Sequence, residues 1–274
     1  MEKAAQLSRE AAEIRKDIIE MIHHAGSGHS GGSLSAAEIV TCLYGGVMRQ
    51  DSADPLNKNR DRFILSKGHA APLLYSVLSR HGYIDREELK TLRRIGSRLQ
   101  GHPNRELIPG IELSTGSLGM GISAGLGMAL AGKLTGRDYR VYVLCGDGEL
   151  DEGQNWEAFM AMSKWRPENL TVIIDYNQVQ LDGNAGDIMP MRDLEAKIGA
   201  FGLKTITCDG HDTEELLKAF EEAREAGEPA VIIAKTIKGK GVSFMEGKHI
   251  WHGKAIGEDE YQQAMKELDI EGEA

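Results

Sequence analysis

The segment Tyr139-Arg-Val-Tyr-Val-Leu-Cys-Gly-Asp-Gly148 is the most informative part of this sequence. Its first seven residues are mostly β-branched, aromatic or otherwise apolar, which predicts a strand, and Gly-Asp-Gly ends that strand abruptly. A second apolar strand is predicted at 170–175, and Asn177 follows it, thirty positions after Asp147. Because the carboxyl ends of parallel strands meet at one edge of a sheet, we expect Asp147 and Asn177 to lie close together there.

Strands and helices alternate along the rest of the chain. Apolar spacing and breaking residues predict helices at 4–24, 33–48, 72–80, 87–95, 117–134, 151–164 and 213–226, and three more strands at 62–66, 204–208 and 230–235. This alternation predicts an α/β fold in which helices cover both faces of a parallel sheet. With no internal repeat and no long linker, residues 1–274 are expected to form a single domain whose acidic tail frays after about residue 269.

Two glycine-rich segments need separate interpretations. The helix predicted at 117–134 contains five glycines, a costly composition for a helix unless another backbone packs closely against it, so we expect this helix to be buried. Lys238-Gly-Lys-Gly241 lacks the spacing of a phosphate-binding loop, and we interpret it as a mobile loop before His252.

Composition limits the partners of the chain. Forty-two acidic and 32 basic residues give a formal charge of −10, which opposes binding to nucleic acid or to an anionic membrane. The first twenty residues are charged, and no apolar run approaches the length of a bilayer. Three widely spaced cysteines predict buried, reduced thiols. We therefore expect a soluble, cytoplasmic protein with no nucleic-acid or membrane partner.

The residues at the predicted sheet edge are suited to binding a phosphate and a metal ion. Asp147, Asn177 and a nearby main-chain carbonyl offer the oxygen ligands that Mg²⁺ prefers, and glycines let the backbone approach a phosphate. A bare Gly-Asp-Gly sequence is more often only a tight turn, but the flanking strands and the asparagine spacing favour a ligand site. The histidines singled out as candidate ligands are His29, His69, His102 and His252, each of which adjoins glycine in a predicted loop where a ligand can reach it.

A family resemblance extends this interpretation. Gly-Asp-Gly followed about thirty residues later by Asn resembles the thiamine-diphosphate motif, and 146–158 resembles the amino-terminal chains of transketolases. Further segments that resemble transketolases, in the same order, lie at 27–31, 61–69, 101–103, 114–119, 209–211 and 251–253. The resemblance covers nearly the whole chain, from about residue 10 to about residue 260. It implies the thiamine-diphosphate-binding fold in its diphosphate-binding (PP) form.

The resemblance also implies a role for individual residues. Asp147, Asn177 and the main-chain carbonyl of Val179 are expected to hold Mg²⁺, and Ca²⁺ or Mn²⁺ can take the same ligands. The residues expected to bind the cofactor are His69, Gly116, Ser117, Leu118, Gly146, Asp147, Gly148, Glu149, Glu152, Asn177 and His252. Glu152 resembles the interface glutamate that links paired active sites, although an exposed glutamate in a first helical turn is nearly as good an interpretation.

The expected activity is ketol transfer by one half of an enzyme. His29, His102 and His252 are the expected catalytic residues, which contact the carbonyl and hydroxyl oxygens of a sugar phosphate. The pyrimidine-binding domain and the arginines that hold the sugar phosphate are expected on a separate C-terminal transketolase subunit, in an assembly of two copies of each chain (α2β2). Together they would transfer a two-carbon ketol unit from a ketose phosphate to an aldose phosphate.

Two alternatives remain at this point. The chain could be the corresponding half of another thiamine enzyme, such as a deoxyxylulose-phosphate synthase or an oxo-acid dehydrogenase. The sequences at 152–157 and 175–183 look more like transketolase. It could also be a non-catalytic diphosphate-binding protein, and the intact set of histidines argues against that.

Overall fold

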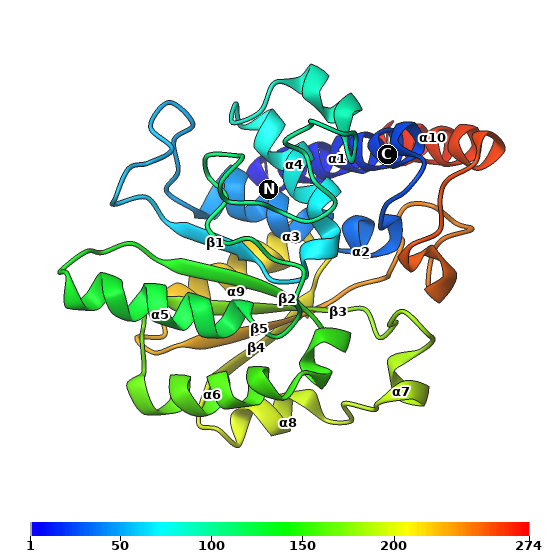
Figure 1. Cartoon of the computed structure of the whole chain (residues 1–274). Helices are drawn as coiled ribbons and strands as arrows, with labels where there is room; N and C mark the ends of the chain where they lie inside the picture. The colour runs from blue at the N-terminus through cyan, green and yellow to red at the C-terminus, as the bar shows by residue number, and fades with distance from the viewer. Residues whose placement is uncertain (1, 274) are drawn as a thin grey trace.

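The computed structural model describes residues 2–273, and its centre is a five-stranded sheet in which all neighbouring strands are parallel (Figure 1). The strands are β1 (Arg62–Leu65), β2 (Val141–Gly146), β3 (Leu170–Tyr176), β4 (Lys204–Asp209) and β5 (Ala230–Lys235), and their order across the sheet is β1-β2-β3-β5-β4. The predicted α/β fold with a parallel sheet is therefore confirmed.

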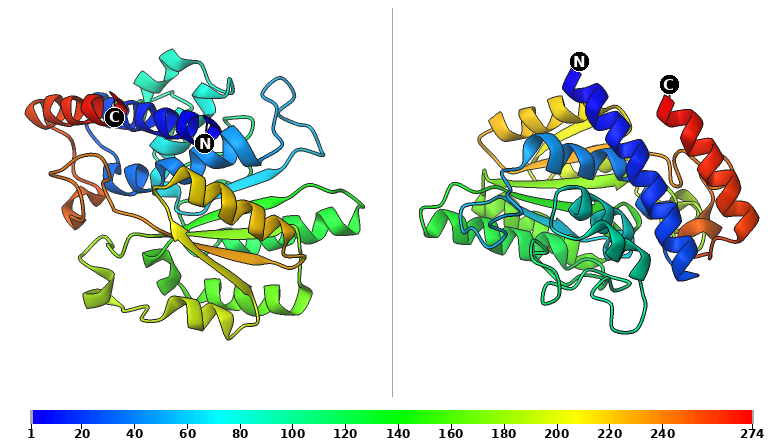
Figure 2. Two further views of the ribbon diagram at one scale, coloured as in Figure 1. Left: turned by 180° about the vertical axis from the view of Figure 1, so that it is seen from behind. Right: turned by 90° about the horizontal axis from the view of Figure 1, so that it is seen from above.

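Helices cover both faces of the sheet, as predicted (Figures 1 and 2). One face carries α1 (Glu2–Ala25), α2 (Ser30–Ser35), α3 (Ala37–Cys42), α4 (Ala71–Arg80), α9 (Thr213–Glu225) and α10 (Glu258–Glu273). The other carries α5 (Gly121–Leu134), α6 (Gly153–Trp165) and α8 (Leu194–Gly199). Shorter turns are η1 (Leu43–Val47), η2 (Gly68–Ala70), η3 (Arg86–Thr91), η4 (Gly148–Asp151), α7 (Ala185–Ile188) and η5 (His249–His252).

Alternation along the strands produces two hydrophobic cores. In β2, Tyr142 and Leu144 belong to the core under α1, α3, α4 and α9, whereas Val141, Val143 and Cys145 belong to the core under α5 and α6. Successive strand residues point to opposite faces, so a strand with both faces covered is apolar throughout. This explains why the sequence of β2 reads as one continuous apolar run.

Two predicted helices differ from the sequence-based expectations. The helix predicted at 33–48 begins at Ser30, is interrupted at Ala36 and ends in the π-helical turn η1, where Gly45 packs closely against Leu7 of α1. The helix predicted at 87–95 is only the 3₁₀ turn η3, which starts with a capping box between Asp85 and Glu88. These are local irregularities that apolar spacing alone cannot distinguish from regular helix.

Helix α10 was not predicted, and it packs along α1 (Figure 2). The Tyr261 ring stacks on the His23 ring with their centroids 4.3 Å apart, and Lys16 pairs with Asp269 at 2.8 Å. Ala264 and Leu268 of α10 are fully buried. The helix extends to Glu273 in the structure, and the fraying expected after about residue 269 stays a prediction.

Other expectations concern the membrane and the cysteines. Among residues 2–273, none of the helices is long and apolar enough to cross a bilayer. Cys42, Cys145 and Cys208 are buried and free of disulfide bonds, as predicted.

The glycine-rich helix α5 is buried on one side only, so the prediction of a buried helix was partly wrong. A Cβ added at Gly125 would overlap the Val143 side chain of β2, which shows how closely the helix approaches the sheet. On its outer side, Gly127 has no atom within 4 Å of an added Cβ, and Leu134 is 88% exposed. Close packing therefore accounts for only some of the glycines.

This difference gives a test within one helix. Gly125→Ala is expected to lower the free energy of unfolding by about 1–3 kcal/mol, because the added methyl group must displace Val143. Gly127→Ala, the matched control, is expected to raise it by up to about 1 kcal/mol through helix propensity alone. Urea unfolding of both variants measures the difference, and equal stabilities would contradict the packing account.

Candidate active site

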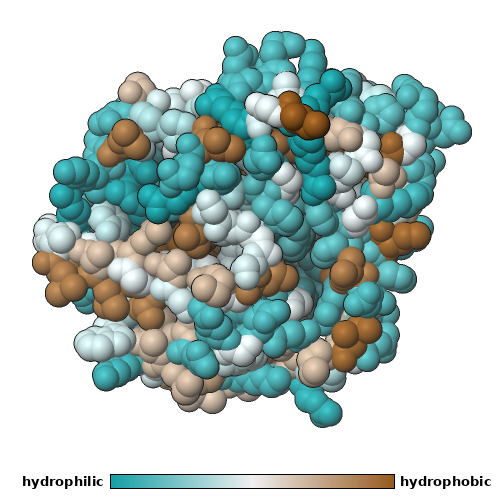
Figure 3. Space-filling model, in the orientation of Figure 1, coloured by the Kyte–Doolittle hydropathy of each residue, from teal (hydrophilic) through white to brown (hydrophobic). Residues whose placement is uncertain are grey.

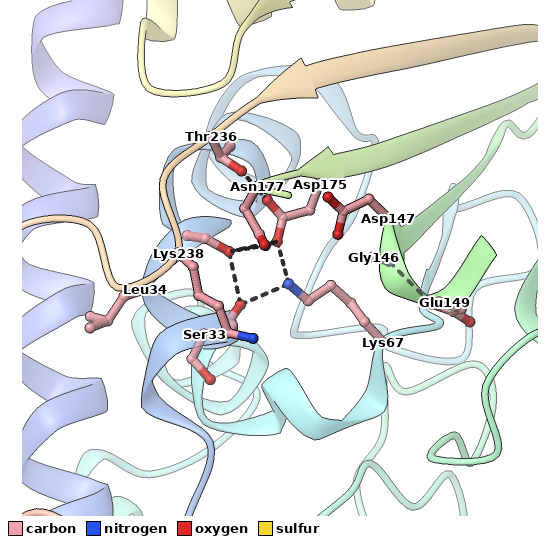
Figure 4. Close-up of polar contacts among 12 residues, drawn as sticks. Ser33, Leu34, Lys67, Gly146, Asp147, Glu149, Asp175, Asn177, Thr236 and Lys238 are labelled. Atoms are coloured by element: carbon pink, nitrogen blue, oxygen red, sulfur yellow. Dashed lines mark hydrogen bonds and ion pairs between the residues drawn. The ribbon is translucent and has the colours of Figure 1, made fainter. Parts of the chain in front are cut away.

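The carboxyl ends of β2 and β3 bring Asp147 and Asn177 together (Figure 4). Gly146, the last residue of β2, is in register with Asp175 of β3, and the Asp147 N–H donates to the Asp175 carbonyl at 3.2 Å. The Asp147 carboxylate accepts hydrogen bonds from the N–H groups of Gly148 and Gln178, the residue after Asn177. The strand register thus gives the predicted proximity.

Asp147 is a buried carboxylate well suited to a cation. It is only 3% exposed, and burial together with the nearby Asp175 raises its pKa to about 6. Among the side chains that the structure describes, Asp147 accepts two backbone N–H bonds and forms no ion pair. A divalent ion would offset the cost of keeping this charge buried.

Asp175 is the hydrogen-bonding centre beneath the site. Its fully buried carboxylate accepts hydrogen bonds from Lys67, from Thr236, from Ser35 Oγ at 2.5 Å and from Asn177 Nδ2 at 3.1 Å. Burial acts to raise the pKa of Asp175, but the Lys67 ammonium and the hydrogen bonds outweigh it and hold the pKa below its usual value. This network fixes the orientation of the Asn177 amide.

Lys238 also reaches into the site, so its interpretation as part of a mobile loop was wrong. It is 2% exposed, and its Nζ donates to the carbonyls of Val179 (2.9 Å) and Gln180 (3.2 Å) and lies 3.0 Å from His252 Nδ1. Burial and the nearby Lys67 lower the pKa of Lys238 to about 8. The lysine is therefore part of the site.

The four glycine-flanked histidines form one cluster. The His29 ring lies 5.6 Å from His69, 6.1 Å from His102 and 5.4 Å from His252, measured between ring centroids. Burial and the nearby Arg93 lower the pKa of His29 to about 4, and burial and the nearby Lys238 lower the pKa of His252 to about 3. Each of these two rings is therefore neutral at pH 7, with one donor nitrogen and one acceptor nitrogen.

A pocket at the sheet edge joins these groups. The residues expected to bind the cofactor or the metal that line it are His69, Leu118, Gly146, Asp147, Gly148, Glu149, Asn177, Val179 and His252. Gly116 is not among the residues that line the pocket; it has a φ of +133°, and a Cβ there would come within 2.9 Å of the His102 ring. His29 lies next to His69 and His252, and His102 lies next to His29, but neither His29 nor His102 lines the pocket.

Three expected cofactor residues are placed differently. The Glu149 carboxylate turns away from Asp147 (Figure 4) and accepts hydrogen bonds from Ser66 Oγ (2.5 Å), Gly119 N (2.9 Å) and Gly146 N (3.2 Å). The Glu149 carboxylate therefore connects the loop after β1, the segment before α5 and the end of β2. Ser117 and Glu152 are exposed and do not line the pocket. Their roles remain predictions.

The donor set fits a metal ion that shares its ligands with a diphosphate. Within the described residues, no three His, Cys, Asp or Glu side chains gather in a way that could hold a metal ion. Asp147, Asn177 and the Val179 carbonyl provide one carboxylate, one amide and one main-chain oxygen. Mg²⁺ typically completes such a partial set with phosphate oxygens and water.

Sequence reasoning missed four polar residues of the site. They are Lys67, Arg93, Asp175 and Lys238, and Arg93 Nη2 lies 3.2 Å from His29 Nδ1. Lys67 and Lys238 each precede a glycine, the same signal that identified the four histidines. Arg93 has a φ of +60° but stands in an ordinary polar stretch, and nothing in the sequence distinguishes it.

Comparison with known proteins identifies the family. The family model described as "Transketolase, thiamine diphosphate binding domain" matches residues 7–274. This chain belongs to the transketolase family. It is 43% identical to the 6-deoxy-6-sulfo-D-fructose transketolase subunit SqwG of Clostridium sp. (strain MSTE9), over 99% of both chains. It is 40% identical to one of the subunits of the apulose-4-phosphate transketolase of Actinobacillus succinogenes, over 97% of both chains.

A solved transketolase shows the same fold. The transketolase of Campylobacter jejuni superposes with a TM-score of 0.91 and 35% identity, covering 96% of this chain but 43% of the solved chain. The chain therefore spans less than half the length of that transketolase, while it matches the two bacterial subunits over almost their whole length.

The neutral histidines give a pH prediction. The folded-state pKa values of His29 and His252 lie below the ordinary value of 6.5, so the unfolded chain binds protons first as the pH falls. Their contribution to stability is present above about pH 6.5 and is lost as the pH falls towards about 4 for His29 and about 3 for His252. In ¹⁵N NMR, assigned with His29→Gln and His252→Gln, both rings are expected to stay neutral down to about pH 5. Midpoints near that of a free histidine peptide would contradict this.

Proposed function

We propose that this chain is the N-terminal subunit of a two-subunit transketolase, which transfers a two-carbon ketol unit from a ketose phosphate to an aldose phosphate. The observation that carries the proposal is the pocket at the sheet edge. It joins the buried carboxylate of Asp147 to the imidazoles of His69 and His252, and the pKa of His252 is lowered to about 3. The family of the chain, with its thiamine-diphosphate-binding domain, supports this proposal.

The chain would hold the diphosphate end of the cofactor. Asp147, Asn177 and the Val179 carbonyl would bind Mg²⁺, and Lys238 and His69 would face the phosphate oxygens as donors. Thiamine diphosphate, when bound, accepts the electrons released as a carbon–carbon bond breaks. The buried Lys67–Asp175 pair keeps the metal side of the pocket rigid.

His29 and His102 would act on the sugar. His29 lies next to His69 and His252, and the exposed His102 lies next to His29. A neutral imidazole can donate a proton from one nitrogen and accept one at the other, which suits the carbonyl and hydroxyl oxygens of a ketose. Such positioned groups are worth roughly 10²–10⁴-fold in rate.

A C-terminal subunit with the pyrimidine-binding domain would complete the site, in an α2β2 assembly. The two relatives of equal length are both named as subunits. Hydrophobic side chains, coloured brown and tan in Figure 3, run along the flank where α5 lies. Leu134 of α5 is 88% exposed, and on α6 Met160 is 55% and Trp165 is 56% exposed. Because α5 follows directly after the pocket residue Leu118, a partner that covers its first turn would also border the pocket.

Co-expression with the C-terminal subunit tests this function. The two chains together, with thiamine diphosphate and Mg²⁺, are expected to transfer a ketol unit, and each chain alone is expected to be inactive. Asp147→Ala is expected to abolish Mg²⁺-dependent cofactor binding with the fold intact, because the buried carboxylate ligand is lost. Asp259→Ala removes the same charge from an exposed position at the start of α10 and is the matched control.

Two results would refute the proposal. Full activity of this chain alone would exclude the need for a partner. A cofactor titration that Asp147→Ala leaves unchanged would remove the metal assignment.

A further inference from the structure

The Lys238 ammonium and the expected metal ion share one oxygen atom. Lys238 Nζ donates to the carbonyl of Val179 at 2.9 Å, and this carbonyl is one of the proposed metal ligands. We propose that Lys238 makes metal binding depend on diphosphate binding, so that the chain takes up a divalent ion only together with the anion. The inference rests on the proposed function and adds a form of regulation to the same site.

All three donors of the ammonium are used. Besides Val179, Nζ donates to the carbonyl of Gln180 at 3.2 Å and to His252 Nδ1 at 3.0 Å. Because Nδ1 accepts from an ammonium, the proton of the neutral His252 ring sits on Nε2. The lysine stem passes close to Gly31, where an added Cβ would come within 3.1 Å of Lys238 Cγ. The ammonium is thus bound in a defined position.

The site already holds two buried cations near the expected position of the metal ion. The ammonium groups of Lys67 and Lys238 are at most 2% exposed, and Lys67 already forms an ion pair with Asp175. A divalent ion at the Val179 carbonyl would add two positive charges next to the Lys238 ammonium, which shares that oxygen. Two cations that share one oxygen atom lie close together, and in a buried site their repulsion is strong because little water screens the two charges.

A diphosphate removes this obstacle. Its negative charge offsets the ion and offers the ammonium a new acceptor in place of the carbonyl. Lysine has a long flexible stem, so the ammonium can turn to the anion without a change in the backbone. The two ligands therefore assist each other: each binds more tightly once the other is present.

Electron paramagnetic resonance of Mn²⁺, titrated into the full chain with and without inorganic pyrophosphate, tests the coupling directly. Wild type is expected to bind Mn²⁺ weakly alone and much more tightly with pyrophosphate. Lys238→Met is expected to bind Mn²⁺ alone at least about tenfold more tightly than wild type, because the competing charge is gone. Lys238→Gln serves as a second variant of intermediate polarity.

Lys240→Met is the matched control. Lys240 lies in the same loop, is partly exposed and pairs with Glu246 at 3.8 Å, so its loss is expected to leave both Mn²⁺ affinities unchanged. If folded Lys238→Met and Lys238→Gln bind Mn²⁺ alone as weakly as wild type, the inference is wrong while the proposed function stands. If wild type binds no Mn²⁺ even with pyrophosphate or thiamine diphosphate, the metal site itself is wrong, and both proposals fail.

Discussion

The buried ion pair between Lys67 and Asp175 is the constraint on which the rest of this structure depends. Its two side chains are at most 1% exposed, and a buried pair is stable only if further hydrogen bonds satisfy both charges. Here Ser35, Thr236 and Asn177 bond to the carboxylate, and the carbonyl of Gly32 accepts from the ammonium at 2.8 Å. The pair therefore ties α2, the loop after β1, the end of β3 and the loop after β5 to one point.

The Lys67–Asp175 ion pair positions residues on two sides of the pocket. Asn177 follows Asp175 by two residues, and His69 follows Lys67 by two residues. One end of the ion pair thus positions a proposed metal ligand, and the other end positions an imidazole of the histidine cluster. Because both residues belong to the parallel sheet or to the loops at its carboxyl edge, the site inherits the rigidity of the central strands.

The sequence predicted those features of the molecule that follow from the order of strands, helices and glycine-containing loops along the chain. The parallel sheet, the contact between the ends of β2 and β3, and the loop positions of the four histidines all follow from strand periodicity and glycine breaks. The glycines that follow Lys67 and Lys238 mark them as loop residues, but their burial could not be predicted, because a lysine is normally exposed and only the tertiary structure supplies the partners that let it be buried. The one-sided burial of α5 was missed for a similar reason, since glycines that approach the sheet and glycines that face solvent look alike in sequence.

The central claim is that the ends of β2 and β3 hold one divalent ion between them, where it can bind a diphosphate. A crystal structure of the chain with Mn²⁺ and thiamine diphosphate, with anomalous data collected at the manganese edge, tests it most directly. The account predicts one anomalous peak in contact with the Asp147 carboxylate, the Asn177 amide oxygen and the Val179 carbonyl. A cofactor bound without such a peak, or a peak that is confined to surface carboxylates, would contradict it.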